Sequence, residues 1–523
     1  MEPPERENDG SPSRSFPGLL RDILRAGRES PAETAQRQQA RLCSLIDFAR
    51  RRSPYYARRY SALPPDVGAL ETLPPVTKEE LTAHFDAWST DPSVTRESAE
   101  AFVADLSRIG RLYLGRYIAF STSGTSGRPA VFLHDPAAAA VYLALTAARR
   151  IPSLIAPASL GSFLKGRART ATIVTTGGHF TSSVVDALAR SRFPLLSGRN
   201  RTFSLMDPLP ALVRSLNDFR PAVVGSYPTA LSVLAGEQQA GRLRIRPALV
   251  LSGAELLSTA LAERISVAFG CPVRDTYAAS EFMGIAFDCR HGRLHVNADW
   301  AILEPVDAAF RPVPPGEASH TTLLTNLANR VQPLIRYDLG DSITVIPSPC
   351  PCGSRLPSIR VEGRHDEVLF PEDGDGVRRP QLPLVLATVV EKTEGLRAYQ
   401  VIQSGSRHLR VRAETAPGYA RAAVCGALLR ALRDHLADQG LEGVSIEISD
   451  DPPLRDTPGG KLRQFLVGQA APGTGDSGAN SVHARCRWSS PRYRANSSPH
   501  WSHRGSLSRS SCCFSLDADD MFC

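Results

Sequence analysis

One short stretch of the chain decides how the rest is interpreted: Phe120-Ser121-Thr122-Ser123-Gly124-Thr125-Ser126-Gly127-Arg128-Pro129. The seven positions 121–127 hold five hydroxyl residues and two glycines. This composition suits a loop whose amides and hydroxyls wrap phosphate oxygens. The stretch matches neither the P-loop nor the dinucleotide-binding fingerprint, and it lacks the nucleophile elbow of a hydrolase. By itself it is explained equally well by a plain Ser/Gly surface turn.

The sequence around this stretch, from about residue 115 to 345, alternates short apolar runs with glycine. Apolar runs at 172–174, 223–224 and 249–251 each end in small polar residues and glycine. Helical stretches such as 228–235 follow some of them. Strand, glycine turn and helix in repetition predict an α/β domain with ligand-binding loops at the carboxyl ends of its strands.

Different patterns flank this domain. Residues 1–35 are rich in Pro, Ser, Arg and Glu and are expected to be disordered, whereas 37–49 show helical spacing. An alternating hairpin at 396–414, an amphipathic helix at 419–436 and a strand at 444–448 predict a small α+β unit. The expected order is a large domain at 36–363, a small domain at 364–470 and a disordered tail at 471–523.

The charge and apolar content exclude several classes of partner. The 523 residues carry 61 basic and 53 acidic side chains, a net charge of +8 scattered along the chain. Because nucleic-acid binders concentrate such charge in a patch, no nucleic-acid partner is expected. No apolar run approaches the roughly 18 residues of a membrane helix, and no secretory signal is evident. We therefore expect a cytoplasmic chain without a membrane partner, whose ten cysteines are thiols or metal ligands.

Three further motifs could carry chemistry. Tyr277 and Glu281, at the end of a short strand, could stack a purine and hold Mg²⁺ near phosphates, although both residue types are common there. Asp341 follows a glycine turn and could accept both hydroxyls of a ribose, or simply cap that turn. Lys461 lies on a glycine loop and is one of only four lysines in the chain.

Taken in order, these motifs resemble the signature of the adenylate-forming superfamily. The order is the Ser/Gly stretch, Tyr277 to Glu281, Tyr337 to Asp341, Gly363 to Glu367, and Gly460-Lys461. More narrowly, the chain is similar to the phenylacetate–CoA ligase family and its deazaflavin-coenzyme adenylyltransferase relatives. Tyr55-Tyr56 and the segment Leu73-Pro74-Pro75-Val76-Thr77-Lys78 resemble that family's opening, and the similarity extends from about Arg37 to Phe465.

The resemblance implies a role for individual residues. The ATP phosphates would be held by Ser123, Gly124, Thr125, Ser126 and Gly127. The adenine pocket would be lined by Gly253, Ala254 and Glu255, with Tyr277 stacked on the ring and Asp341 on the ribose. Three residues would be catalytic: Glu281 by binding Mg²⁺, Arg364 at the ribose edge, and Lys461, which would meet the carboxylate and α-phosphate. Asp366 would mark the hinge between the AMP-binding domain and a mobile small domain.

The activity that the resemblance implies is ATP-dependent activation of a carboxylic acid, aryl or related, as an acyl-adenylate, followed by transfer to a thiol. CoA is the expected acceptor; a carrier protein and a homodimeric state are left open. Two alternatives remain. One is a nucleotidyltransferase that adenylates a hydroxyl of a deazaflavin-type coenzyme, indicated by the runs 295–299 and 326–330. The other is an inactive nucleotide-binding relative, because the family has Gly where this chain has Ala278; Arg128 replaces a frequent Lys.

The cysteines suggest a metal site. Cys289 is followed by His291 and His295, and Cys350 and Cys352 flank a proline before Gly353. Three thiols and one imidazole would complete a tetrahedral structural Zn²⁺ site, which the resemblance also implies. We prefer His295 because it precedes a strand, as the histidine of the similar family does. The alternative is a Pro/Gly turn with two incidental thiols.

The stretch Thr175-Thr176-Gly177-Gly178-His179-Phe180 is a candidate wall for the acyl pocket. His179 could face the substrate, but a structural histidine with its ring nitrogens hydrogen-bonded is the favoured interpretation.

Overall fold

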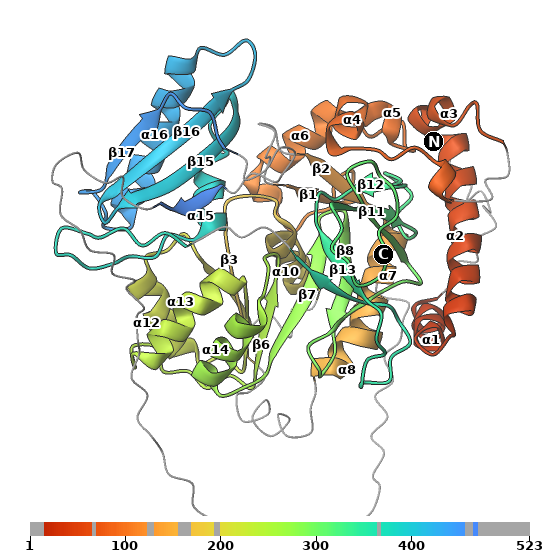
Figure 1. The fold of residues 1–523 in the computed structure, drawn as a ribbon, viewed down its shortest axis with the longest axis horizontal. Coiled ribbons are helices and arrows are strands. Elements are labelled where there is room, and N and C mark those ends of the chain that lie inside the picture. The colour runs from red at the N-terminus through yellow and green to blue at the C-terminus, as the bar shows by residue number, and fades with distance from the viewer. Residues whose placement is uncertain are drawn as a thin grey trace, which may run out of the picture. The chain divides into compact units, whose positions relative to one another are not determined.

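Nine strands form the largest sheet of the structure (Figure 1). The computed structural model describes residues 15–64, 70–122, 130–154, 169–192, 199–362, 368–454 and 464–468, which all belong to one unit, Met1–Gln469. The strands are β3 (Thr170–Val174), β4 (Asn200–Ser204), β5 (Val223–Ser226), β6 (Leu249–Gly253), β7 (Val273–Ala279), β8 (Phe282–Asp288), β9 (Leu294–Val296), β13 (Ile343–Ile346) and β14 (Ser358–Val361). Their order in the sheet is β13-β14-β9-β8-β7-β6-β5-β3-β4.

The half of the sheet from β4 to β7 is parallel. Helices α10 (Thr181–Arg192), α12 (Leu209–Phe219), α13 (Pro228–Gln239) and α14 (Thr259–Phe269) follow β3, β4, β5 and β6. Figure 1 shows α12, α13 and α14 beside β6, where their apolar faces cover the strands in one buried cluster. The predicted repetition of strand, glycine turn and helix is confirmed, because each apolar run is long enough for a buried strand but too short for a helix.

The other half of the sheet is antiparallel and starts from the β7–β8 hairpin. A second buried cluster covers it, formed with α7 (Pro136–Leu145) and α1 (Phe16–Ala26). A π-helix, η3 (Thr146–Arg150), and the short α8 (Ile151–Leu154) continue α7.

Helix α1 differs from the sequence-based expectation, because residues 16–35 fall in the segment expected to be disordered. Leu19, Ile23 and Ala26 recur at helical spacing and are buried in the cluster around α7. Asp22 forms ion pairs at 2.8 Å with Arg37 and with Arg41 of the next helix, α2 (Pro31–Arg52). The helix was not expected because the segment is polar overall and only these three residues form its apolar face.

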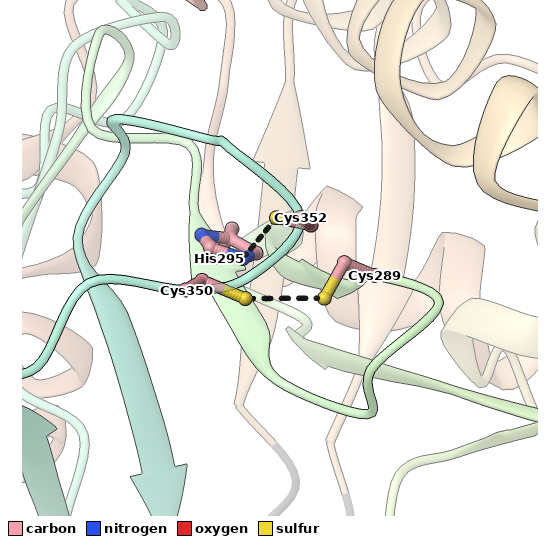
Figure 2. A group of neighbouring side chains, drawn as sticks. All are labelled: Cys289, His295, Cys350 and Cys352. Carbon is pink, nitrogen blue, oxygen red and sulfur yellow. Dashed lines mark hydrogen bonds between the residues drawn. The ribbon is translucent and has the colours of Figure 1, made fainter.

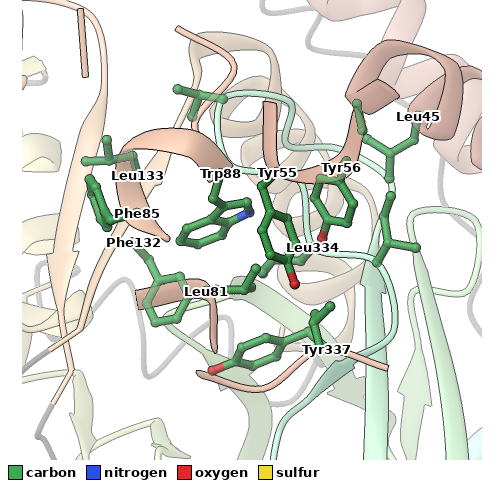
Figure 3. Close-up of a cluster of buried hydrophobic side chains, with 14 of the residues drawn as sticks. Leu45, Tyr55, Tyr56, Leu81, Phe85, Trp88, Phe132, Leu133, Leu334 and Tyr337 are labelled. Carbon is green, nitrogen blue, oxygen red and sulfur yellow. The ribbon is translucent and has the colours of Figure 1, made fainter. Parts of the chain in front are cut away.

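A third buried cluster joins the amino-terminal helices to two small sheets (Figure 3). It contains α2, α3 (Pro54–Arg59), η1 (Leu70–Thr72), α4 (Lys78–Ala83), α5 (Phe85–Trp88), α6 (Arg96–Ala104), the hairpin β1 (Ile118–Ser121)–β2 (Val131–His134), and part of the sheet β10 (Ala301–Val306)–β11 (Thr321–Asn326)–β12 (Tyr337–Asp338). A short η2 (Leu106–Arg108) follows α6. Tyr56 and Trp88 both donate hydrogen bonds to the Pro333 carbonyl, at 3.0 and 2.7 Å. The helices therefore hold the loop that precedes β12.

A separate four-stranded sheet has the order β17-β16-β15-β18. Its strands are β15 (Leu396–Gly405), β16 (His408–Thr415), β17 (Ser445–Ser449) and β18 (Phe465–Val467), with helices α15 (Pro383–Val390) and α16 (Arg421–Asp438). These elements share one apolar core and confirm the predicted hairpin, helix and strand. The proposed domain boundary at 363–364, the hinge residue Asp366 and the expected tail lie outside the described residues.

No helix among the described residues is both long and apolar enough to cross a lipid bilayer.

Candidate functional site

The carboxyl ends of the parallel strands meet at one edge of the large sheet. Strand β3 pairs with β4 on one side and with β5 on the other, so the direction in which the chain adds strands reverses at β3. Ligands of open α/β sheets bind at such a reversal, outside the carboxyl ends of the strands. The loop Thr175–Phe180, the candidate acyl-pocket wall, follows β3 at this point.

The Ser/Gly stretch begins at the same edge. Ser121 N–H donates to the His179 carbonyl at 2.9 Å, and Thr122 N–H donates to the Ala130 carbonyl at 3.0 Å. Ser123, Gly124, Thr125, Ser126 and Gly127 lie outside the described residues, as does Arg128. The first flank of the stretch thus lies against the loop that follows β3, and the two flanks are bonded to each other.

Lys78, for which the sequence alone predicts no role, contacts the start of this stretch. Its ammonium donates to Thr122 Oγ1 at 2.8 Å and interacts electrostatically with the Glu281 carboxylate. Lys78 is the first residue of α4, and Thr77 caps that helix by accepting the Glu80 N–H. Two signals could have identified it: the scarcity of lysine in the chain and its place in the segment Leu73–Lys78.

Glu281 lies in the two-residue turn between β7 and β8 and is 9% exposed. Tyr337 O–H donates to its Oε1 at 2.9 Å. Burial raises the pKa of Glu281 above its usual range, while Lys78 and the Tyr337 hydroxyl oppose that rise. An oxygen donor whose charged form is desolvated in this way is stabilised by a hard divalent cation, so the residues fit Mg²⁺ at this place.

The side chains predicted to bind adenine and ribose lie together. Tyr277 O–H donates to Asp341 Oδ2 at 3.0 Å, and burial raises the pKa of Tyr277 well above its usual range, so the phenol stays protonated. The turn-capping role considered for Asp341 belongs to Asp338, whose Oδ1 accepts the Gly340 N–H at 2.8 Å. The Asp341 carboxylate therefore faces Tyr277 instead of its own turn.

The segment Gly253 to Glu255 follows β6, beside Tyr277 on β7. A Cβ on Gly253 would lie 3.2 Å from the Thr276 carbonyl, so this position favours glycine, and Ala254 has a left-handed φ of 68°. The Glu255 carboxylate accepts from Thr229 N–H and Oγ1–H, both at 3.0 Å, at the start of α13. Its side chain therefore binds that helix terminus.

Two other residues raised by the sequence analysis are placed clearly. Ala278 is half-buried and lies at a register shift between Tyr277 and Ala279, so it occupies an irregular position of β7. His179 is buried, with its ring 5.5 Å from that of Phe102.

The structure brings Cys289, His295, Cys350 and Cys352 together (Figure 2). Cys289 follows β8, His295 lies on β9, and the other two thiols come from the turn between β13 and β14. The four ligand atoms all lie within 4.8 Å of one another, and His291 is not among them.

The geometry of this Cys/His group fits a tetrahedral zinc ion. Cys289 Sγ lies 3.6 Å from Cys350 Sγ, and Cys352 Sγ lies 3.3 Å from His295 Nε2. Zinc–sulfur bonds of about 2.3 Å imply tetrahedral edges of about 3.8 Å, slightly shorter where one ligand is nitrogen. His295 Nδ1 lies 3.1 Å from the Leu356 carbonyl, which can only accept, so Nδ1 carries the proton and Nε2 faces the thiols with its lone pair.

Arg364 and Lys461, two of the three residues expected to be catalytic, lie outside the described residues. Of the predicted nucleotide and metal residues that the structure describes, Tyr277, Glu281 and Asp341 lie at one edge of the sheet. The Cys/His group lies at the far ends of β8 and β9, away from the β7–β8 turn.

Comparisons with known proteins agree with this fold. No family model matches the chain. It is 26% identical to protein CapK of Staphylococcus aureus over 133 residues, which are 25% of this chain and 28% of that protein. It is similar to the structure of a 2-hydroxyisobutyryl-CoA ligase in complex with 2-HIB-AMP and CoA, with 20% identity, a TM-score of 0.50, and coverage of 85% of this chain and 92% of that one.

A benzoate CoA ligase from Burkholderia xenovorans LB400 is also similar, with 16% identity, a TM-score of 0.32, and coverage of 65% of this chain and 67% of that one. The chain has the fold of the adenylate-forming ligases, with a large amino-terminal and a small carboxy-terminal domain, which confirms the predicted fold class.

Proposed function

We propose that this protein is an ATP-dependent, AMP-forming ligase of the phenylacetate–CoA ligase type. It activates an aryl or related carboxylic acid as an acyl-adenylate and transfers the acyl group to a thiol, with CoA as the acceptor. The observation that carries the proposal is the meeting of Tyr277, Asp341, Glu281 and Lys78 at the carboxyl edge of the sheet, beside the start of the Ser/Gly stretch.

In this proposal, each of the residues that meet at the carboxyl edge of the sheet takes part in binding the nucleotide. Tyr277 packs against adenine and Asp341 accepts the ribose hydroxyls, while the backbone at Gly253 and Ala254 borders the base. Lys78 and the Ser/Gly stretch bind the phosphates. A lysine offers a compact ammonium on a flexible stem, which suits a phosphate tail whose charge moves during reaction.

Glu281 would hold Mg²⁺, which when bound neutralises phosphate charge. Its carboxylate must be ionised for this role, and Lys78 favours that form by lying close to it. The neighbouring carboxylate of Asp341 acts in the opposite direction, raising the pKa of Glu281. A divalent cation bound beside Glu281 therefore relieves the repulsion between the Glu281 and Asp341 carboxylates.

The first half-reaction joins two anions. A carboxylate oxygen of the acid attacks the α-phosphorus, the bond from that phosphorus to the bridging oxygen breaks, and pyrophosphate leaves with the electron pair. Cationic groups stabilise the negative charge that accumulates on the phosphate oxygens. In this proposal the protein supplies two such groups, Lys461 and Lys78. In the second half-reaction the thiolate attacks the acyl carbon, and AMP leaves.

The Cys/His group is proposed as a structural zinc site. Its four ligands would join the end of β8 and β9 to the turn between β13 and β14, which are otherwise held by backbone pairing. A closed site with four protein ligands leaves no open position for substrate, so zinc would stabilise the sheet and take no part in the reaction.

The test is pyrophosphate release from Mg·ATP over a panel of aryl and fatty acids and hydroxy coenzymes, with Asp341→Ala and Lys461→Ala as controls. Acid-dependent release that both variants lose, together with AMP and a thioester when CoA is added, is the expected result. Release only with a hydroxy coenzyme, with AMP retained in the product, would assign the transferase activity instead. ATP binding without release from any compound would contradict both activities.

A further inference from the structure

The turn that carries Glu281 is held by side chains from four separate elements. His134, the last residue of β2, approaches the Ser280 carbonyl with Nε2 at 2.7 Å. Asn326, the last residue of β11, donates from Nδ2 to the Glu281 carbonyl at 2.9 Å. Tyr337 holds the Glu281 carboxylate, and Thr181 Oγ1 lies 3.0 Å from Ser280 Oγ. Both turn carbonyls are therefore bound by side chains that are distant in sequence.

Tyr142, on α7, connects two of these contacts. Its hydroxyl accepts from Asn326 Nδ2 at 2.9 Å and lies 3.1 Å from His134 Nδ1. His134, Tyr142 and Asn326 are almost fully buried, at 1%, 4% and 0% exposed. We call these three residues the turn network.

The hydrogen bonds of the turn network run in one direction. The Ser280 carbonyl can only accept, so His134 carries its proton on Nε2. Nδ1 is then an acceptor, and Tyr142 donates its hydroxyl hydrogen to it while accepting from Asn326. The two Asn326 N–H groups are both used, and its Oδ1 accepts from Ala328 and Asn329 N–H, which fixes the orientation of the amide.

The end of β2 is held in place as well. Asn329 Nδ2 donates to the Leu133 carbonyl at 2.8 Å, and Leu133 N–H donates to Gln332 Oε1 at 2.8 Å. Burial lowers the pKa of His134 to about 4, so its ring is neutral at pH 7 and one nitrogen is free to accept from Tyr142. The run 326–330, which suggested the transferase branch in the sequence, thus has a structural role in this chain.

We infer that His134, Tyr142 and Asn326 are positioning residues that fix the Ser280–Glu281 turn for binding of the divalent cation and nucleotide together. The inference rests on the proposed function only in taking Glu281 as the residue that meets the cation. A ligand carboxylate on an unsupported two-residue turn could rotate away from the cation. Side chains that orient such ligands typically contribute 10- to 100-fold in metal affinity or activity.

The test is the binding of ATP by titration calorimetry, once with Mg²⁺ and once with EDTA, in the full chain and in Tyr142→Phe. The variant loses only the hydroxyl that joins His134 to Asn326. We expect Mg·ATP to bind roughly tenfold more weakly, while ATP in EDTA binds within about twofold of the wild type. Tyr117→Phe is the matched control, because it removes another buried hydroxyl, donated to Asp91 at 2.6 Å, and should change neither value. Equal weakening with and without Mg²⁺, or none in either, overturns the inference.

A second measurement applies even if Tyr142→Phe does not fold. In wild-type protein labelled with ¹⁵N-histidine, the His134 signals, assigned by their loss in His134→Gln, should report the neutral ring with the proton on Nε2 at pH 7. A proton on Nδ1, or a charged ring, overturns the inference. Neither measurement requires an acid. If Mg·ATP binding follows the expected pattern but no acid releases pyrophosphate, the ligase proposal fails and the inference stands. If pyrophosphate release by Tyr142→Phe depends on Mg²⁺ as it does in the wild type, the inference fails and the ligase proposal stands.

Discussion

Tyr277 and Asp341 are 64 residues apart in the sequence, yet the Tyr277 hydroxyl donates to Asp341 Oδ2 at 3.0 Å. One residue lies on β7 and the other follows the short strand β12. The bond links the side chain proposed for adenine to the one proposed for ribose, so the orientation of each depends on the other.

Replacing Tyr277 by Phe should therefore weaken nucleotide binding while keeping the aromatic face. We expect the KM for ATP to rise about tenfold, equivalent to about 1.4 kcal/mol, because Asp341 loses the donor that orients it. The value of kcat should stay within about twofold. Steady-state kinetics with saturating acid would measure both.

Tyr399→Phe is the matched control for this change. Tyr399 O–H donates to Glu391 Oε1 at 3.1 Å in the core of the four-stranded sheet. It should leave the KM for ATP unaltered. An unchanged KM in Tyr277→Phe would show that Asp341 needs no support from β7.

Lys78 should be required for the reaction of ATP. Lys78→Met removes the ammonium that binds Thr122 and opposes the charge of Glu281. We expect kcat/KM for ATP to fall about 100-fold, the effect typical of losing one stabilising donor in an active site. Lys78→Arg should recover only part of the loss, since a planar guanidinium does not replace a compact ammonium.

Arg246→Met removes an exposed cation of the same chain and should have no effect on kcat/KM. Full activity in Lys78→Met, measured as pyrophosphate release, would exclude Lys78 from phosphate binding.

The Cys/His group should bind one zinc ion per chain. We expect one equivalent of zinc by mass spectrometry of the purified protein, and loss of that metal in Cys352→Ser. At a free zinc concentration 100 times the dissociation constant, binding to the folded state alone contributes about 2.7 kcal/mol, so chelation should lower the free energy of unfolding by at least that order.

Cys425→Ser, on α16 outside the group, should keep both the zinc and the stability. Protein that contains no zinc when purified without chelators, and whose urea unfolding does not respond to added zinc, would contradict the site.

His134 should make the fold less stable in mild acid. Burial lowers its pKa from 6.5 to about 4, so between these values the unfolded chain binds a proton that the folded chain does not. The free energy of unfolding should therefore fall as the pH drops from about 6.5 to 4, by about 3 kcal/mol from this residue. Urea unfolding at pH 7.0 and 4.5 would measure the difference.

The matched variant for this prediction is His134→Gln, which can still donate to the Ser280 carbonyl but does not titrate. Other buried histidines remain in both proteins, so the difference between the two pH profiles isolates His134. Parallel profiles would mean that His134 gains its proton in the folded protein as readily as in the unfolded one.

The sequence predicted well those features that depend on neighbouring residues. The apolar runs before glycine became β3, β5 and β6, and the alternation on either side of Gly405 became β15 and β16. Such patterns record which face of an element is buried, and that information is local. The Cys/His group was also predicted, because three thiols and one imidazole are the ligand set of a tetrahedral zinc site, and the structure brings these four side chains together.

What could not be predicted depends on distant pairs. Lys78 and Thr122 are 44 residues apart, His134 and Ser280 are 146 apart, and Tyr142 and Asn326 are 184 apart. Their meeting follows from how α4, the β1–β2 hairpin, α7, β7 and β11 assemble, and no local pattern specifies it. Helix α1 was not predicted for a different reason. Three apolar residues in a polar segment are too few to indicate burial unless the helix they pack against, α7, is known.

Helix α1 has a practical consequence for anyone who produces this protein. Because the amino-terminal segment is polar and was expected to be disordered, it would be natural to truncate the protein at about residue 35. Such trimming would uncover the apolar surface that Leu19 and Ile23 cover, leave Arg149 without the Ile23 carbonyl to which its Nη2 donates at 3.1 Å, and leave Arg37 and Arg41 without Asp22. A shortened recombinant product should therefore aggregate, and a fused tag belongs ahead of Ser15.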